Sequence, residues 1–80
     1  TSNKGVLGHL MGAAGSVEAI AAILSLREGL IPPTRLELEP DPACDLDYVV
    51  REPRRATLRV ALSNSAGIGG CNAALILRKP

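Results

Sequence analysis

The first strong pattern along the chain is an apolar segment, residues 12–26, in which only two serines and Glu18 are polar. Apolar side chains recur there at intervals of three and four residues, which is typical of an α-helix. Gly29 suits the left-handed position after a helix end, and Pro32-Pro33 prevents the helix from continuing. The sequence therefore predicts one helix over about residues 9–28.

This helix would be apolar on nearly every side, because alanine, isoleucine and leucine cover most of the helical wheel. Such a helix is normally buried on several sides. Eighty residues without Phe or Trp, and with Tyr48 as the only aromatic residue, offer little that could cover it. We therefore expect the chain to be a piece of a larger protein.

The second half of the chain has the pattern of a connector followed by two strands. Residues 34–55 carry prolines and most of the acidic residues, with a short extended piece at Tyr48–Val50. Apolar and polar residues then alternate over residues 57–63, and an apolar run follows over residues 72–78. Because a short glycine-rich loop joins the two runs, they are predicted to pair as an antiparallel hairpin.

Charge and cysteine usage exclude several classes of function. The net charge is +1, and the basic cluster Arg51, Arg54 and Arg55 is not interleaved with aromatic residues, so no nucleic-acid partner is expected. Cys44 and Cys71 lack the spacing of a metal site, and we expect reduced thiols in a cytoplasmic protein with no metal and no cofactor. No uncharged run of membrane-spanning length occurs, so no membrane span is expected.

Three residues around the start of the predicted helix are candidates for chemistry. His9 is the only histidine, a residue type that can act as acid, base or hydrogen-bond donor near neutral pH, and a structural role at the helix start is the alternative. Glu18 stands alone in the apolar segment, and a buried carboxylate must be paired or protonated. Lys4 is the nearest plausible partner in sequence, although a lysine is also at home on the surface.

The segment NSAGIGGCN, residues 64–72, allows two interpretations. Its glycines can form a flexible hairpin loop, or they can expose backbone N–H groups to an oxyanion or a phosphate. The segment lacks the Lys-Ser/Thr ending of a P-loop. Cys71 precedes a strand, not a helix N-terminus that would activate a thiol, so it is not expected to be a nucleophile.

Several motifs, in order and at matching intervals, resemble the C-terminal end of the β-ketoacyl-acyl-carrier-protein synthases, the condensing enzymes of fatty-acid and polyketide synthesis. NKGVLGHLMGAAGSVEA, residues 3–19, is similar to the family's Lys-Ser-x-x-Gly-His-x-x-Gly-Ala-Ala-Gly-x-x-Glu block. IPPT (residues 31–34), CDLDYV (residues 44–49) and SNSAGIGGCNAALIL (residues 63–77) follow in the family's order. The resemblance extends over essentially the whole chain and is closer to the discrete fatty-acid elongation type.

The resemblance implies an α/β, thiolase-like fold to which this chain contributes a C-terminal αββ piece. The piece comprises the helix at about 9–28, a long connector, and an antiparallel strand pair at about 57–63 and 72–78. Residues 1–80 would then be the C-terminal segment of the synthase's C-terminal domain, incomplete as a catalytic unit. In the complete fold the apolar helix would be buried centrally between two sheets.

The resemblance also assigns roles to individual residues. His9 would be the second active-site histidine, which as a neutral imidazole donor assists the decarboxylation of malonyl-carrier protein. Lys4 would be the active-site lysine, and Glu18 the glutamate that pairs with it. The oxyanion and acyl-gate loop would comprise Gly67, Ile68 and Gly69, with the backbone N–H of Ile68 as one donor.

Three positions depart from the family pattern. Ala66 and Ile68 stand where the family usually has phenylalanine, which puts the acyl-chain preference in doubt, and Cys71 replaces a threonine. The family's nucleophilic cysteine and first active-site histidine belong to an earlier portion that these 80 residues lack. The chain alone is therefore expected to be inactive.

The sequence thus favours part of a β-ketoacyl synthase, an acyltransferase that performs decarboxylative Claisen condensation. Its expected partners are the acyl carrier protein, the missing N-terminal portion of the same enzyme, and a second subunit in a homodimer or heterodimer. Two alternatives remain at this stage. One is a non-condensing relative such as a chain-length-factor subunit, and the other is a stand-alone helix–hairpin interaction module.

Overall fold

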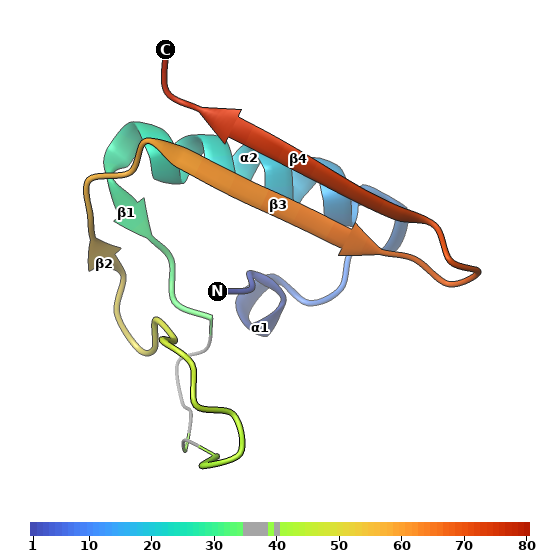
Figure 1. Ribbon diagram of the computed structural model, residues 1–80, viewed down its shortest axis with the longest axis horizontal. Coiled ribbons are helices and arrows are strands. Elements are labelled where there is room, and N and C mark those ends of the chain that lie inside the picture. The colour runs from blue at the N-terminus through green and yellow to red at the C-terminus, as the bar shows by residue number, and fades with distance from the viewer. Residues whose placement is uncertain (35–38, 40) are drawn as a thin grey trace.

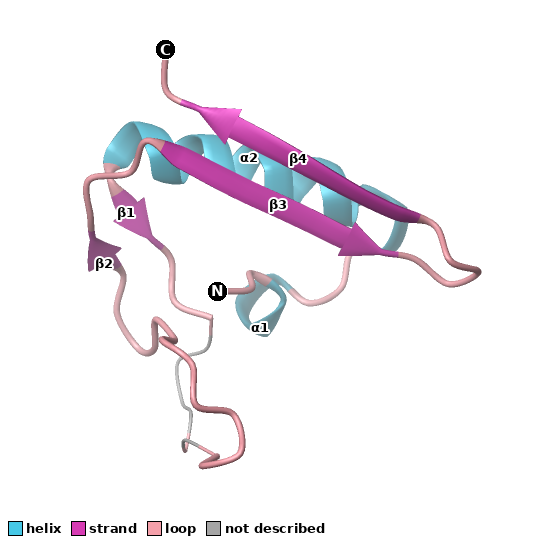
Figure 2. Cartoon of the chain, in the orientation of Figure 1, coloured by secondary structure: helices cyan, strands magenta, loops and turns pink. Residues whose placement is uncertain are grey.

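The computed structural model describes residues 1–34, 39 and 41–80. A long helix, α2, packs against a hairpin of two strands, β3 and β4, and a smaller strand pair lies beside the helix end (Figures 1 and 2). The predicted helix followed by an antiparallel strand pair is confirmed. The elements in chain order are α1 (Lys4–Leu7), η1 (Met11–Ala13), α2 (Ala14–Glu28), β1 (Leu30–Ile31), β2 (Arg54–Arg55), β3 (Val60–Ala66) and β4 (Asn72–Arg78).

The helix begins later than predicted and ends where predicted. α2 starts at Ala14, not near residue 9, because the backbone has a positive φ at Gly8 (75°) and at Met11 (50°), and an α-helix needs a negative φ. The 3-10 turn η1 leads from there into α2. At the other end Gly29 is left-handed (φ 64°, ψ 37°), and its N–H donates a hydrogen bond to the Ser25 carbonyl oxygen at 2.9 Å.

Strand β4 coincides with its prediction, whereas β3 is displaced by three residues from the predicted 57–63. The ladder extends from Val60 opposite Arg78 to Ala66 opposite Asn72. One more hydrogen bond, from the Lys79 N–H to the Arg59 carbonyl oxygen at 3.0 Å, continues the ladder. Before it the chain is tied to the helix end, where the Ala56 N–H donates to the Gly29 carbonyl oxygen at 3.0 Å.

Two small elements were not predicted. α1 is a single helical turn, and β1 and β2 form a two-residue ladder in which Leu30 lies opposite Arg55 and Ile31 opposite Arg54. Their sequences are too short to carry a helical or alternating pattern. The predicted connector, residues 34–55, therefore ends in a strand. Its residues 35–38 and 40 lie outside the described residues.

Few side chains of this chain are buried. Among the described residues the buried apolar side chains are Ala14, Leu26 and Val49. By contrast, Leu62 and Ile76, which lie opposite each other in the hairpin, are 64% and 73% exposed. The expectation that 80 residues cannot cover such an apolar helix agrees with this exposure. Much of the apolar surface of α2 and of the hairpin is uncovered.

Candidate active site

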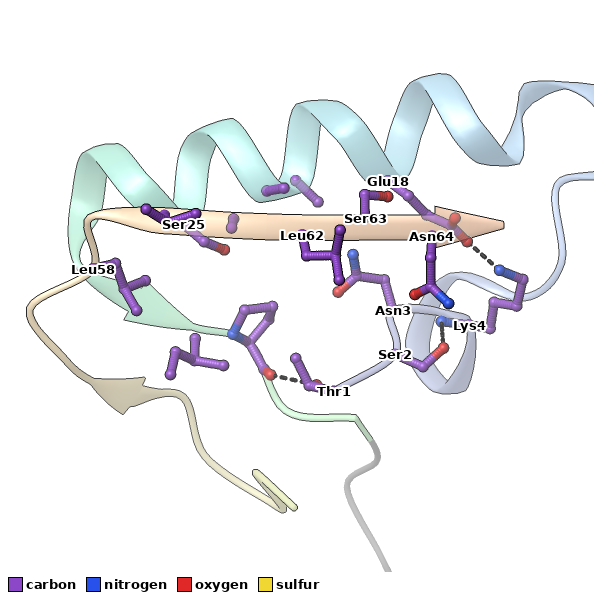
Figure 3. A pocket seen from close by; sticks show the side chains of 16 residues that line it. Thr1, Ser2, Asn3, Lys4, Glu18, Ser25, Leu58, Leu62, Ser63 and Asn64 are labelled. Carbon is purple, nitrogen blue, oxygen red and sulfur yellow. Dashed lines mark hydrogen bonds and ion pairs between the residues drawn. The ribbon is translucent and has the colours of Figure 1, made fainter. Parts of the chain in front are cut away.

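The structure brings Lys4 and Glu18 into contact. Lys4 is the first residue of α1 and Glu18 lies in the second turn of α2, so residues fourteen apart in sequence meet through the turn between the two helices. The Lys4 Nζ donates a hydrogen bond to Glu18 Oε1 and forms an ion pair with it (Figure 3). The Glu18 side chain is only 17% exposed, so the pair supplies the cation that the partly buried carboxylate needs.

His9 lies in the link between α1 and η1, and the backbone holds its ring. The His9 Nδ1 accepts a hydrogen bond from the Met11 N–H at 3.0 Å. In the neutral imidazole this places the proton on Nε2, which is then the donor nitrogen. Met11 makes this contact with a positive φ of 50°, a conformation that costs a non-glycine residue about 1–2 kcal/mol. Strain of this kind is concentrated at functional sites.

The loop between β3 and β4 is closed by its own backbone. The Gly67 N–H donates to the Cys71 carbonyl oxygen at 2.6 Å, and the Gly70 N–H donates to the Gly67 oxygen at 3.3 Å. Gly69 and Gly70 have φ of 90° and 83°, which only glycine adopts without strain. The Ile68 side chain at the tip is fully exposed, and its backbone N–H has no hydrogen-bond acceptor within the part of the chain that the structure describes.

The predicted site residues are only partly assembled in this chain. Lys4 and Glu18 line a cavity of about 440 Å³ between the N-terminal segment, α2 and β3 (Figure 3). His9 and the glycine-rich loop do not line it. The loop and the start of α2 lie at the same end of the molecule (Figure 1).

Two residues that the sequence analysis did not single out also line this cavity. Ser63 and Asn64, near the end of β3, face the Lys4–Glu18 pair (Figure 3). The signal that could have identified them is the polar run Ser63–Ser65 inside an otherwise apolar strand. A polar run of this kind in a strand that packs on a helix indicates a polar cavity.

Arg54, one residue of the basic cluster, forms an ion pair within the connector. Its guanidinium binds the Asp47 carboxylate through two hydrogen bonds, Nη1 to Oδ2 at 2.7 Å and Nη2 to Oδ1 at 2.9 Å. These hydrogen bonds and the charge of Arg54 hold the pKa of the Asp47 carboxyl below its usual value. The pair closes the loop before β2 and lies outside the candidate site.

Residues 1–34, 39 and 41–80 do not meet the requirements of a metal site, a disulfide or a membrane-spanning helix. These residues contain no cluster of three or more His, Cys, Asp or Glu side chains that could hold a metal ion. Cys44 and Cys71 are both exposed and unpaired. Within the same residues no helix is long and apolar enough to cross a membrane.

Comparison with known proteins identifies the family. Residues 1–36 match the family described as "Beta-ketoacyl synthase, C-terminal domain". The chain is 46% identical over 79 residues to 3-oxoacyl-[acyl-carrier-protein] synthase 2 of Synechocystis sp., covering 99% of this chain and 19% of that protein. It is 43% identical over 79 residues to nodulation protein E of Rhizobium meliloti, covering 99% of this chain and 20% of that one.

A solved structure agrees with these relatives. The ishigamide ketosynthase/chain length factor matches with a TM-score of 0.80 and 42% sequence identity, over 86% of this chain and 17% of that chain. The chain spans about a fifth of the length of the curated relatives that it matches. It is thus a relative of the β-ketoacyl synthases, and it corresponds, as its motifs predicted, to the C-terminal part of that family.

Proposed function

We propose that this chain is the C-terminal part of a β-ketoacyl synthase that extends acyl chains in fatty-acid or polyketide synthesis. The observation that carries the proposal is the ion pair between Lys4 and Glu18, two of the three residues that the family motif predicts for the site. Sequence identity of 42–46% to synthases over nearly the whole chain supports it.

The proposed reaction needs one nucleophile from outside this chain. A cysteine in the preceding part of the protein holds the acyl group as a thioester. The malonyl thioester on acyl carrier protein loses CO₂, and the electron pair of the broken C–C bond forms an enolate. The enolate carbon attacks the acyl carbonyl carbon, a new C–C bond forms, and the cysteine thiolate leaves.

The role that we assign to His9 is to stabilise the enolate. Because the Met11 N–H occupies Nδ1, the Nε2–H of the neutral ring is free to donate to the malonyl thioester oxygen, where negative charge develops. The Lys4 ammonium is held by Glu18, and we assign it a role in ordering the site without taking part in bond making.

The glycine-rich loop is proposed to supply an oxyanion donor for the attack on the acyl carbonyl. The N–H of Ile68 lies between Gly67 and Gly69 at the tip of the loop, where little backbone packing surrounds it. Hydrogen-bond donors aimed at a developing oxyanion are among the largest contributions to such catalysis. Ala66 and Ile68 leave this loop without the aromatic gate of the family, so a different acyl-chain preference is expected.

Acyl carrier protein and a second subunit are the partners that we propose for the complete enzyme. The matching solved structure is named as a ketosynthase together with a chain length factor. The chain alone carries no residue that we assign as nucleophile. We therefore expect it to be active only together with the rest of the synthase.

The decisive experiment measures CO₂ release and condensation by the complete synthase with malonyl-acyl-carrier protein. We expect His9→Ala to lower decarboxylation about 10²–10³-fold because the enolate loses its donor. His9→Gln keeps a side-chain N–H and is the matched control, which should retain more activity than His9→Ala. Decarboxylation at the unaltered rate in both variants would contradict the role of His9, and a complete protein that releases no CO₂ would contradict the function.

A further inference from the structure

The threonine of the IPPT motif makes contacts that the proposed mechanism does not use. Thr34 lies next to the start of the chain, and its Oγ1 accepts a hydrogen bond from the Ser2 N–H at 3.0 Å. The same hydroxyl donates to the Ser2 carbonyl oxygen at 3.2 Å. One side chain thus engages both backbone groups of a residue 32 positions away in sequence.

The segment that carries Thr34 is itself fixed on two sides. The Thr34 N–H donates to the carbonyl oxygen of Val49, a buried residue of the connector, at 2.8 Å. The Thr1 hydroxyl donates to the Pro32 carbonyl oxygen at 2.9 Å (Figure 3). The N-terminal residues are therefore tied to a segment that the connector already anchors.

These contacts continue to the candidate site through Ser2. The Ser2 Oγ accepts a hydrogen bond at 3.3 Å from the N–H of Lys4, the first residue of α1 (Figure 3). α1 contains four residues, and a helix of one turn has no stability of its own because its nucleation is unfavourable. The position of Lys4 must therefore be set by contacts outside the helix.

We propose that Thr34 is a positioning residue that holds Lys4 against Glu18. Its hydroxyl fixes Ser2, and the Ser2 Oγ holds the backbone N–H of Lys4. The Lys4 ammonium then meets the Glu18 carboxylate at the wall of the 440 Å³ cavity. This inference rests on the proposed function for its catalytic consequence. The structural part, that the Thr34 hydroxyl restrains residues 1–4, is independent of that function.

The test compares Thr34→Val, which keeps the shape and removes the hydroxyl, with Thr34→Ser, which keeps the hydroxyl. In the complete synthase we expect Thr34→Val to lower the kcat of malonyl decarboxylation roughly tenfold with little change in KM. Thr34→Ser should restore most of kcat. Thr57→Val is the matched control, because Thr57 is exposed and its hydroxyl has no hydrogen-bond partner among the described residues.

A double-mutant cycle separates positioning from a merely structural role. If Thr34 acts through Lys4, Thr34→Val should have no further effect on kcat in the Lys4→Ala background. Three outcomes would overturn the proposal. The losses of kcat could multiply in the double variant, Thr34→Ser could be as slow as Thr34→Val, or Thr34→Val could be as fast as the unaltered enzyme.

Hydrogen exchange distinguishes failure of this inference from failure of the proposed function. In the same complete protein, the amides of residues 1–7 should exchange about tenfold faster in Thr34→Val than in Thr57→Val, whether or not the protein decarboxylates malonyl groups. Exchange that is unchanged in Thr34→Val would refute the restraint itself. An inactive unaltered protein with the expected exchange would refute only the proposed function.

Discussion

At the scale of single residues, the candidate site depends on a few backbone groups in unusual conformations. Met11 has a left-handed backbone, and its N–H binds His9 Nδ1. Gly8, which precedes the histidine, also has a positive φ. The sequence identified His9 from its residue type and its motif, but the contact that selects its tautomer comes from a backbone conformation that no local propensity favours in methionine.

The strain at Met11 leads to a prediction about stability. Met11→Gly should leave the free energy of unfolding of the complete synthase within about 1 kcal/mol, because relief of strain offsets the greater entropy of unfolded glycine. In Met11→Val the free energy of unfolding should be about 1–2 kcal/mol lower than in Met11→Gly, since a β-branched residue tolerates a positive φ worst. Urea denaturation checks both values. A Val variant as stable as the Gly variant would show that Met11 is not strained in the complete protein.

At the scale of secondary structure elements, the positions of glycine and proline predicted where α2 ends more accurately than the apolar pattern predicted where it starts. Gly29 and the two prolines after β1 end α2 where the sequence predicted. The start of α2 was predicted too early because apolar periodicity continues through residues 9–13, where the backbone turns. β3 was misplaced because its limits are set by the tie between Ala56 and Gly29, which is a tertiary contact.

The two helix-associated glycines Gly29 and Gly15 should respond oppositely to alanine. Gly29→Ala places a Cβ 3.1 Å from the Ala56 carbonyl oxygen at a φ of 64°, so we expect the free energy of unfolding to fall by about 1–2 kcal/mol. Gly15 lies in the first turn of α2, where no described residue of this chain comes within 4 Å of an added Cβ, and Gly15→Ala should raise the value by about 0.5–1 kcal/mol. Urea denaturation of the protein that contains the chain measures both. Equal effects would refute the left-handed cap.

At the scale of the whole molecule, the chain exposes surfaces that a larger fold would bury. α2 covers one side of the hairpin (Figure 1). Leu62 on β3 and Ile76 on β4 are exposed. The relatives are about five times as long as this chain, as its 19–20% coverage of them indicates. Exposed apolar side chains on both strands are what we expect of a piece of a larger fold.

This exposure predicts that the isolated 80-residue chain associates with itself. Sedimentation velocity at micromolar concentration should give a mass above the 8.3 kDa of one chain. Leu62→Lys combined with Ile76→Glu replaces a directly opposite apolar pair by an ion pair and should reduce the association. A monomeric chain that unfolds cooperatively would contradict the prediction and favour the stand-alone module.

The sequence by itself determined the features that depend on neighbouring residues or on whole motifs. These are the end of α2 at Gly29, the second strand of the hairpin, and the family to which the motifs point. The tertiary structure formed the contact between Lys4 and Glu18 that the family motif led us to expect, and it alone decided the limits of β3 and the contact that orients His9. The physical reason is that turns and helix ends depend on local backbone preferences, whereas the limits of β3 and the Lys4–Glu18 contact depend on segments that meet only after the chain has folded.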